Sequence, residues 1–91
     1  MDLKTKITNI KNLSRKEQKE FAELWVVMGL PCIFRYGLAW KGASAKVITR
    51  EKAMSLLPKY SFGMGFYELS FVRYNGEDAL EFNELGENDM Y

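Results

Sequence analysis

The chain has 91 residues and a net charge of +1, with 47% hydrophobic side chains, one cysteine and no histidine. This length predicts one domain with a modest core, and 27% charged residues with only two prolines argue against disorder. The lack of histidine excludes the commonest general base and metal ligand, and the single cysteine excludes an internal disulfide, so we expect no metal and no cofactor.

Three segments of the chain differ in composition. Residues 1–13 alternate apolar side chains with lysines, which predicts an N-terminal arm or an edge strand guarded by its charges. Residues 14–85 hold the periodic apolar patterns and predict a single α+β domain. Residues 86–91 are polar and acidic, and we expect them to form an exposed C-terminal tail.

The first helix is expected to begin after Ser14. Ser14 and Glu17 have the spacing of a capping box, in which each side chain accepts a hydrogen bond from a free N–H of the first turn. Gly29 suits the left-handed position after a helix, and Pro31 prevents the helix from continuing. Four apolar residues recur at helical spacing and predict the buried face: Phe21, Leu24, Trp25 and Met28.

Residues 24–34 contain no polar side chain. The run is too short to span a bilayer and lacks the features of a secretory signal, so we expect no membrane segment. Cys32 lies within it and is predicted to be buried, because a free cysteine behaves as a small hydrophobe. A reduced, buried thiol favours a cytoplasmic location.

After Pro31 the apolar period changes to two, which predicts a strand with Phe34 and Tyr36 on its buried face. A tight turn at residues 41–42 returns the chain and places Tyr36 opposite Val47. A slip of one residue would exchange the buried and the exposed face of the strand. The expected register therefore places large aromatic side chains opposite small apolar ones.

A second, shorter helix is expected over residues 50–57. Thr49 can cap its first turn, and Pro58 stops it because the residue before a proline avoids helical geometry. Its apolar stripe contains Ala53 and Leu57.

Asn75 and Gly76 separate two alternating segments and give the strongest hairpin signal in the chain. Counting back from this turn pairs Phe71 with Leu80 on a buried face. The element order is therefore α-β-β-α-β-β, and we expect an antiparallel four-stranded sheet of two hairpins with two helices packed on one face. The outer face of the second hairpin is then polar and contains Glu68, Ser70, Glu81 and Asn83.

The carboxylate pair that this fold brings together is Glu68 with Glu81. They are diagonal neighbours, about 7–8 Å apart, and such a distance suits acid/base work by two carboxylates. A flat, solvated sheet face offers nothing to raise either pKa, however, so a solubilising role is favoured. We predict that the protein is not an enzyme.

Charge is distributed unevenly along the chain. Residues 1–60 carry twelve Lys and Arg against five Asp and Glu, a net charge of +7, whereas residues 61–91 carry one against seven, a net charge of −6. Such asymmetry can steer association with a charged partner or with a second copy.

We therefore expect a small non-enzymatic regulatory protein, of the adaptor or inhibitor type, that acts through protein–protein interaction or as a homodimer. The loop after the second helix can present a hydrophobic tip, and the acidic tail has the composition of a docking segment. The expected partner-binding residues are Phe62, Met64, Glu84, Glu87, Asp89 and Tyr91.

The alternative is a small nucleic-acid-binding accessory protein that uses the basic first 60 residues. Such binding needs cations gathered on one surface to neutralise phosphates, and its affinity would fall steeply with salt. The sequence contains no helix-turn-helix, zinc-finger or RNP-like motif in support. Its expected binding residues are Lys4, Lys6, Lys11, Arg15, Arg35, Lys41, Lys46 and Arg50.

Overall fold

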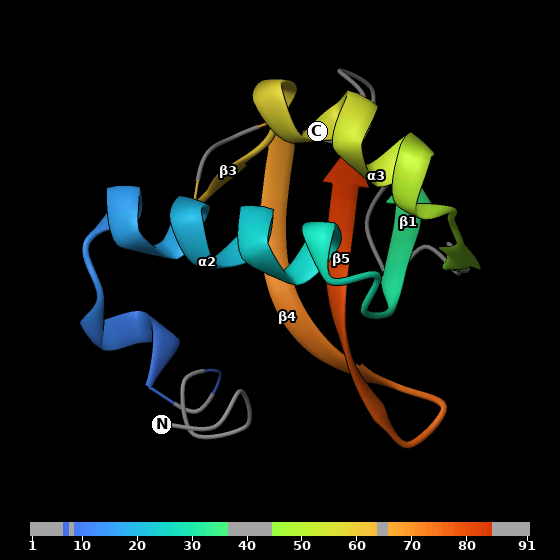
Figure 1. Ribbon diagram of the computed structural model, residues 1–91, viewed down its shortest axis with the longest axis horizontal. Helices are drawn as coiled ribbons and strands as arrows, with labels where there is room; N and C mark the ends of the chain where they lie inside the picture. The colour runs from blue at the N-terminus through green and yellow to red at the C-terminus, as the bar shows by residue number, and fades with distance from the viewer. Residues whose placement is uncertain (1–6, 8, 37–44, 64–65, 85–91) are drawn as a thin grey trace, which may run out of the picture.

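The computed structural model describes residues 7, 9–36, 45–63 and 66–84. They form an α+β fold in which the helices α2 and α3 cover one face of a five-stranded sheet (Figure 1). Two further short helices are of the 3-10 type. In chain order the elements are η1 (Ile10–Asn12), α2 (Arg15–Val27), β1 (Cys32–Tyr36), β2 (Lys46–Val47), α3 (Arg50–Leu56), η3 (Leu57–Lys59), β3 (Ser61–Phe62), β4 (Tyr67–Tyr74) and β5 (Glu77–Glu84).

The sheet is mixed, with the strand order β2-β1-β5-β4-β3. β1 lies antiparallel to β2 and parallel to β5, while β3 lies parallel to β4. The prediction of an α+β domain is confirmed, but the prediction of four antiparallel strands is wrong. Pairing between strands that are distant in sequence leaves no local turn signal, so the parallel contact of β1 with β5 was not expected. The two-residue edge strand β3 lies where a loop was expected.

The second hairpin is confirmed residue by residue. Phe71 lies opposite Leu80 and Arg73 opposite Asp78, as counted back from the turn. Asn75 and Gly76 both have positive φ, 52° and 82°. This geometry matches the right-handed twist of the flanking strands, which is why Asn-Gly is favoured there.

The predicted register of the first hairpin is wrong. β1 and β2 pair so that Ile33, and not Tyr36, lies opposite Val47. An odd shift moves Val47 from the helix-facing side to the outer side of the sheet. The physical reason is that β1 pairs along its length with β5, which fixes its position independently of any tight turn. The expected turn at residues 41–42 lies outside the described residues.

Both predicted helix starts are confirmed. The backbone N–H of Glu17 donates to Ser14 Oγ, and the backbone N–H of Ser14 donates to Glu17 Oε1, each at 3.1 Å. Thr49 Oγ1 accepts a hydrogen bond from the backbone N–H of Lys52 at 3.1 Å. α2 is followed by Gly29 with φ of 73°, the left-handed conformation expected after a helix end.

The predicted buried face of α2 is only half right. Phe21 and Trp25 are buried as expected, but Ala22 and Val26 fill the rest of the buried face. The predicted members Leu24 and Met28 are 45% and 53% exposed. α2 packs on both the sheet and α3, so its buried side is rotated toward the sector that both neighbours reach.

The core lies between the two helices and the sheet. Trp25 packs edge-on against Phe71, with ring centroids 5.2 Å apart, and its indole N–H donates to the carbonyl of Pro31 at 2.8 Å. The strand residues of this face include Cys32, Phe34, Leu69, Phe71, Leu80 and Phe82. Burial of Cys32, as predicted, is confirmed.

The two ends of the chain were expected to form separate segments. Of the expected arm or edge strand over residues 1–13, the described part contains the 3-10 helix η1. Residues 1–6 and 8, and the expected tail over residues 86–91, lie outside the described residues.

Candidate functional site

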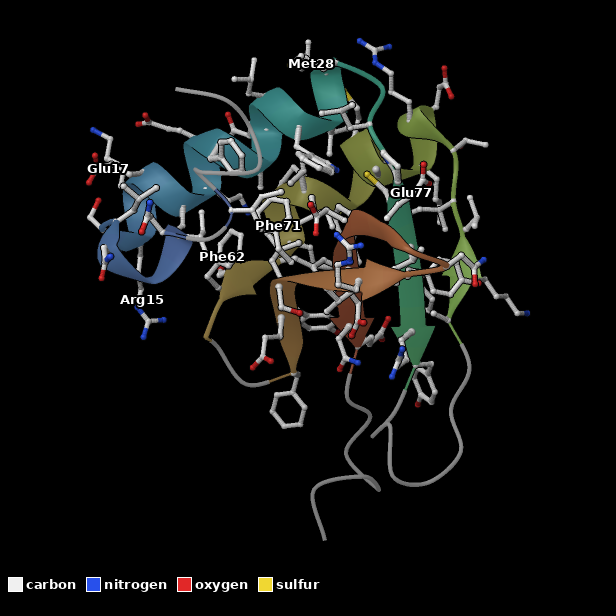
Figure 2. The ribbon with its side chains drawn as sticks, turned by 90° about the horizontal axis from the view of Figure 1, so that it is seen from below. Arg15, Glu17, Met28, Phe62, Phe71 and Glu77 are labelled. Atoms are coloured by element: carbon white, nitrogen blue, oxygen red, sulfur yellow. The ribbon has the colours of Figure 1, made fainter. Side chains whose placement is uncertain are left out.

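Of the expected partner-binding residues, the structure describes Phe62 and Glu84. Phe62 is half-buried on β3, and its ring stacks on Phe71 with centroids 6.1 Å apart, between the helices and the sheet (Figure 2). Its carbonyl accepts a hydrogen bond from Arg15 Nη1 at 2.5 Å. Phe62 therefore contributes to packing at this edge. The others, apart from Glu84, lie outside the described residues: Met64, Glu87, Asp89 and Tyr91.

Glu84 ends β5 beside the fully buried Tyr60. The Tyr60 hydroxyl donates to Glu84 Oε2 at 3.3 Å. Burial raises the pKa of Tyr60 well above its ordinary value, and the negative charge of Glu84 raises it further. Tyr60 therefore stays protonated and donates its hydrogen bond. Glu84 accepts this bond and so satisfies a buried hydroxyl group.

The expected nucleic-acid-binding residues do not gather on one surface within the described part of the chain. Arg15 lies at the start of α2, whereas Arg50 lies at the other end, where its Nε donates to the carbonyl of Val27 at 3.1 Å. Arg35 lies on the outer face of the sheet and Lys46 on the edge strand β2. The side chains of the remaining four lie outside the described set: Lys4, Lys6, Lys11 and Lys41.

The outer face of the sheet carries a polar cluster of three residues. Arg35 Nη2 lies 3.6 Å from Glu81 Oε2, and Asn83 Nδ2 donates to Glu81 Oε1 at 3.4 Å. Glu81 is only 7% exposed, and the Nε of Arg35 is buried without a hydrogen-bond partner. Glu68 lies opposite Asn83 and is thus diagonal to Glu81, as expected. Arg35 and Glu81 therefore form an ion pair on the outer face of the sheet.

Within the described ranges, His, Cys, Asp and Glu side chains nowhere gather in the groups of three or more that could hold a metal ion. In the same part of the chain, no helix has both the length and the apolar character that a transmembrane span requires.

An exposed apolar surface on α2 was missed by the sequence reasoning. Leu24, Val27 and Met28 are 45%, 51% and 53% exposed, and their spacing of three and four residues places them on one side of the helix. We call these three residues the α2 stripe. The available signal was the uninterrupted apolar run from Leu24 to Met28, which turns through more than a full helical turn and so cannot be buried on one face.

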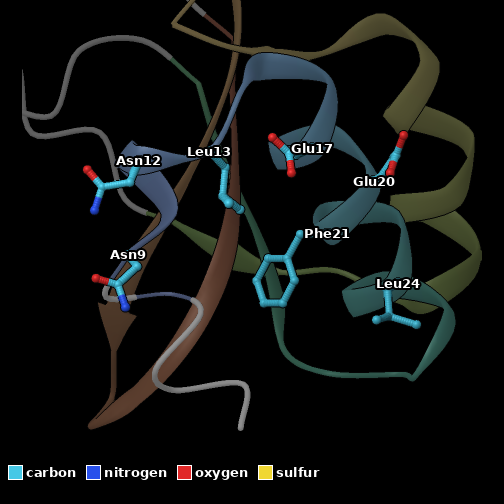
Figure 3. Close-up of a pocket in the computed structure, with 7 residues that line it drawn as sticks. All are labelled: Asn9, Asn12, Leu13, Glu17, Glu20, Phe21 and Leu24. Atoms are coloured by element: carbon cyan, nitrogen blue, oxygen red, sulfur yellow. The ribbon is translucent and has the colours of Figure 1, made fainter. Parts of the chain in front are cut away.

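A hollow of about 490 Å³ adjoins the α2 stripe through Leu24. In Figure 3, Asn9 and Asn12 lie on one side of it and Leu24 lies on the other, with the Phe21 ring between. We call this cavity the α2 hollow; its lining residues are Asn9, Asn12, Leu13, Glu17, Glu20, Phe21 and Leu24.

The charges around the α2 stripe differ between the two ends of the helix. Glu17 and Glu20 are exposed in the first half, on the side of the α2 hollow. α3 runs antiparallel alongside α2. At the C-terminal end of α2, Arg50 donates to the carbonyl of Val27, and in the first half of α2 the ammonium group of Lys19 donates to the carbonyls of Leu57 and Tyr60. Two carboxylates therefore border the α2 hollow and the guanidinium group of Arg50 lies at the far end of the helix, while Arg15 and Lys16 line a separate pocket beside Phe62.

Cys32 is buried at the start of β1, where its thiol donates to the carbonyl of Leu30 at 3.4 Å. Burial raises the pKa of the thiol from 9.0 to about 11. The folded state therefore keeps, between pH 9 and pH 11, a proton that the unfolded state releases. A reactive thiol requires the opposite environment, so Cys32 is unsuited to nucleophilic chemistry.

We expect stability to fall as the pH rises from 9 to 11, and to fall less steeply in Cys32→Ala than in the wild-type protein. The free energy of unfolding by urea, measured at intervals across this range, tests the difference. Tyr60 remains in both proteins and contributes equally, so the comparison isolates the thiol. Equal slopes would contradict the raised pKa.

Comparison of the chain with models of known protein families, with curated proteins and with solved structures finds no match. The function is therefore inferred from the geometry alone.

Proposed function

We propose that the protein acts without catalysis, by binding another protein through the α2 stripe and the α2 hollow. The observation that carries this proposal is the exposure of three large apolar side chains on one side of α2. Single exposed apolar residues are ordinary, but a contiguous set beside a hollow is typical of an interaction site. An adaptor or inhibitor fits this surface better than an enzyme does.

Covering the α2 stripe would supply useful affinity. Full burial of a Leu, Val or Met side chain is worth about 1.5–3 kcal/mol. Since these side chains are about half exposed, a partner would gain roughly 1 kcal/mol from each. Three such contributions correspond to a change of about 100-fold in the dissociation constant.

The test is photo-crosslinking from the stripe in the cells that produce the protein. A benzoylphenylalanine at position 27 is expected to form an adduct of higher mass on irradiation, because Val27 is in the stripe. The same probe at position 47 is the matched control, since Val47 is also an exposed valine but lies on the edge strand β2. Adding Met28→Lys to the position-27 protein should remove most of the adduct.

Equal adduct formation from positions 27 and 47, or none from position 27, would refute this function. Where an adduct forms, its mass tells whether the partner is a second copy of this chain, which would add 10.6 kDa.

A further inference from the structure

When two copies of α2 are placed antiparallel, the charges at the two ends of one exposed side are complementary to those of the other. On the side of the α2 hollow its first half carries the carboxylates of Glu17 and Glu20, since Arg15 and Lys16 line a separate pocket, and its second half is the apolar α2 stripe. Beyond the stripe stands Arg50, which is exposed and is held against the end of the helix by its hydrogen bond to the carbonyl of Val27. No acidic side chain among the described residues forms an ion pair with Arg50.

Resting on the function proposed above, we propose that the partner is a second copy of this chain, bound with the two α2 helices packed antiparallel and crossing near Leu24. Such a dimer is two-fold symmetric, so each contact occurs twice. Glu20 and Met28 lie four residues to either side of Leu24, about 6 Å along the axis. Glu20 of each copy therefore faces the end of α2 in the other copy, where Arg50 stands.

Charge selects the antiparallel arrangement. A parallel pair of α2 helices would set the carboxylates of one copy against those of the other, and like charges at an interface are costly. The antiparallel pair sets Glu20 against Arg50 at both ends and leaves the α2 stripe in the centre. Figure 2 shows Glu17 and Met28 near opposite ends of α2, consistent with this division.

The α2 hollow provides a place for a side chain of the second copy. In the antiparallel arrangement Met28 of the second copy lies over Glu20 and Phe21, two of the residues that line the hollow. Methionine is unbranched and flexible, and it fills irregular gaps well. Asn9 and Asn12 close the far side of the hollow, so the same contact covers both the stripe and the cavity beside it.

The area of this contact limits its strength. α2 has 13 residues and is about 20 Å long, so one helix pair covers less than the roughly 800 Å² per partner of a stable interface. We therefore expect a monomer–dimer equilibrium with a dissociation constant of roughly 0.1 mM.

Sedimentation equilibrium of the full chain, from about 10 µM to about 1 mM, tests the proposal. The wild-type mass should rise from one copy toward two. Glu20→Arg and Arg50→Glu should each weaken dimerisation about tenfold, because each sets like charges together at two symmetric places. The double variant Glu20→Arg/Arg50→Glu exchanges the charges and should return the dissociation constant to within about threefold of the wild-type value.

Lys46→Glu is the control, since it changes an exposed charge on the edge strand β2 and should leave the dimer unaltered. A monomer at every concentration would overturn the second copy as partner, although a crosslink from position 27 to a different protein would leave the proposed function standing. A wild-type dimer that the double variant fails to restore would overturn the antiparallel geometry.

Discussion

Phe82→Ala should lower the free energy of unfolding by about 3–5 kcal/mol, the usual cost of removing a large aromatic side chain from a packed core. Phe82 is fully buried on β5, between Phe34 of β1 and Leu69 of β4, and its ring meets Tyr60 edge-on with centroids 5.4 Å apart. In a domain of this size the loss corresponds to a fall of roughly 15–30 °C in melting temperature, measurable by circular dichroism.

Phe66→Ala is the matched control for this change. Phe66 is 44% exposed, so the same truncation there should cost less than about 1 kcal/mol. Because the total stability of such a domain is only about 5–15 kcal/mol, Phe82→Ala is close to the limit of folding. Phe82→Leu, expected to cost about 1–2 kcal/mol, keeps the comparison measurable. Equal losses at positions 66 and 82 would show that the Phe82 ring is not packed.

Arg35→Met should be the second most damaging change, with an expected cost of about 2–3 kcal/mol. It removes the cation beside Glu81, whose buried carboxylate then keeps the hydrogen bond from Asn83 at 3.4 Å. The cost is expected below the maximum for a buried pair, since the Arg35 side chain is 24% exposed and the two charged atoms are 3.6 Å apart. Urea unfolding at neutral pH measures it.

The double variant Arg35→Met/Glu81→Leu should recover most of this loss. Replacement of a buried ion pair by apolar side chains is often neutral, and Ile33 and Ala79 already make this part of the outer face apolar. A coupling energy of about 1–3 kcal/mol is expected in the double-mutant cycle.

Arg73→Met provides the matched control for the ion pair. Arg73 pairs with Asp78 at 3.4 Å, but its side chain is 63% exposed. Exposed pairs are worth about 0–1 kcal/mol, so this variant should remain close to the wild-type stability. If Arg35→Met were equally mild, burial would not strengthen the contact with Glu81.

Local signals in the sequence were sufficient for the parts of the fold that local contacts determine. Ser14 and Glu17 cap α2 within one turn, and Asn75 and Gly76 fix the register of β4 on β5 through a two-residue turn. In both cases the atoms that interact are within a few residues of each other. Their geometry is therefore a property of the segment itself.

The remaining parts depend on contacts between distant segments. The five consecutive apolar residues from Leu24 to Met28 exceed what one helix face can bury. Which of them face solvent is decided by α3 and the sheet, which select Trp25 and Val26. The α2 stripe was not recognised in the sequence for this reason, since two of its members, Leu24 and Met28, also fit the pattern of a buried face.

The position of β5 in the sheet has a consequence for how the molecule is made. β5 is the central strand of the five, yet it is the last described strand in the chain. During synthesis on a ribosome, β1 and β4 have no common neighbour until β5 has emerged, so the sheet cannot be assembled strand by strand as the chain grows. Contacts over such sequence separations slow folding. We expect the apolar faces of the helices to remain partly exposed until β5 is in place and completes the core.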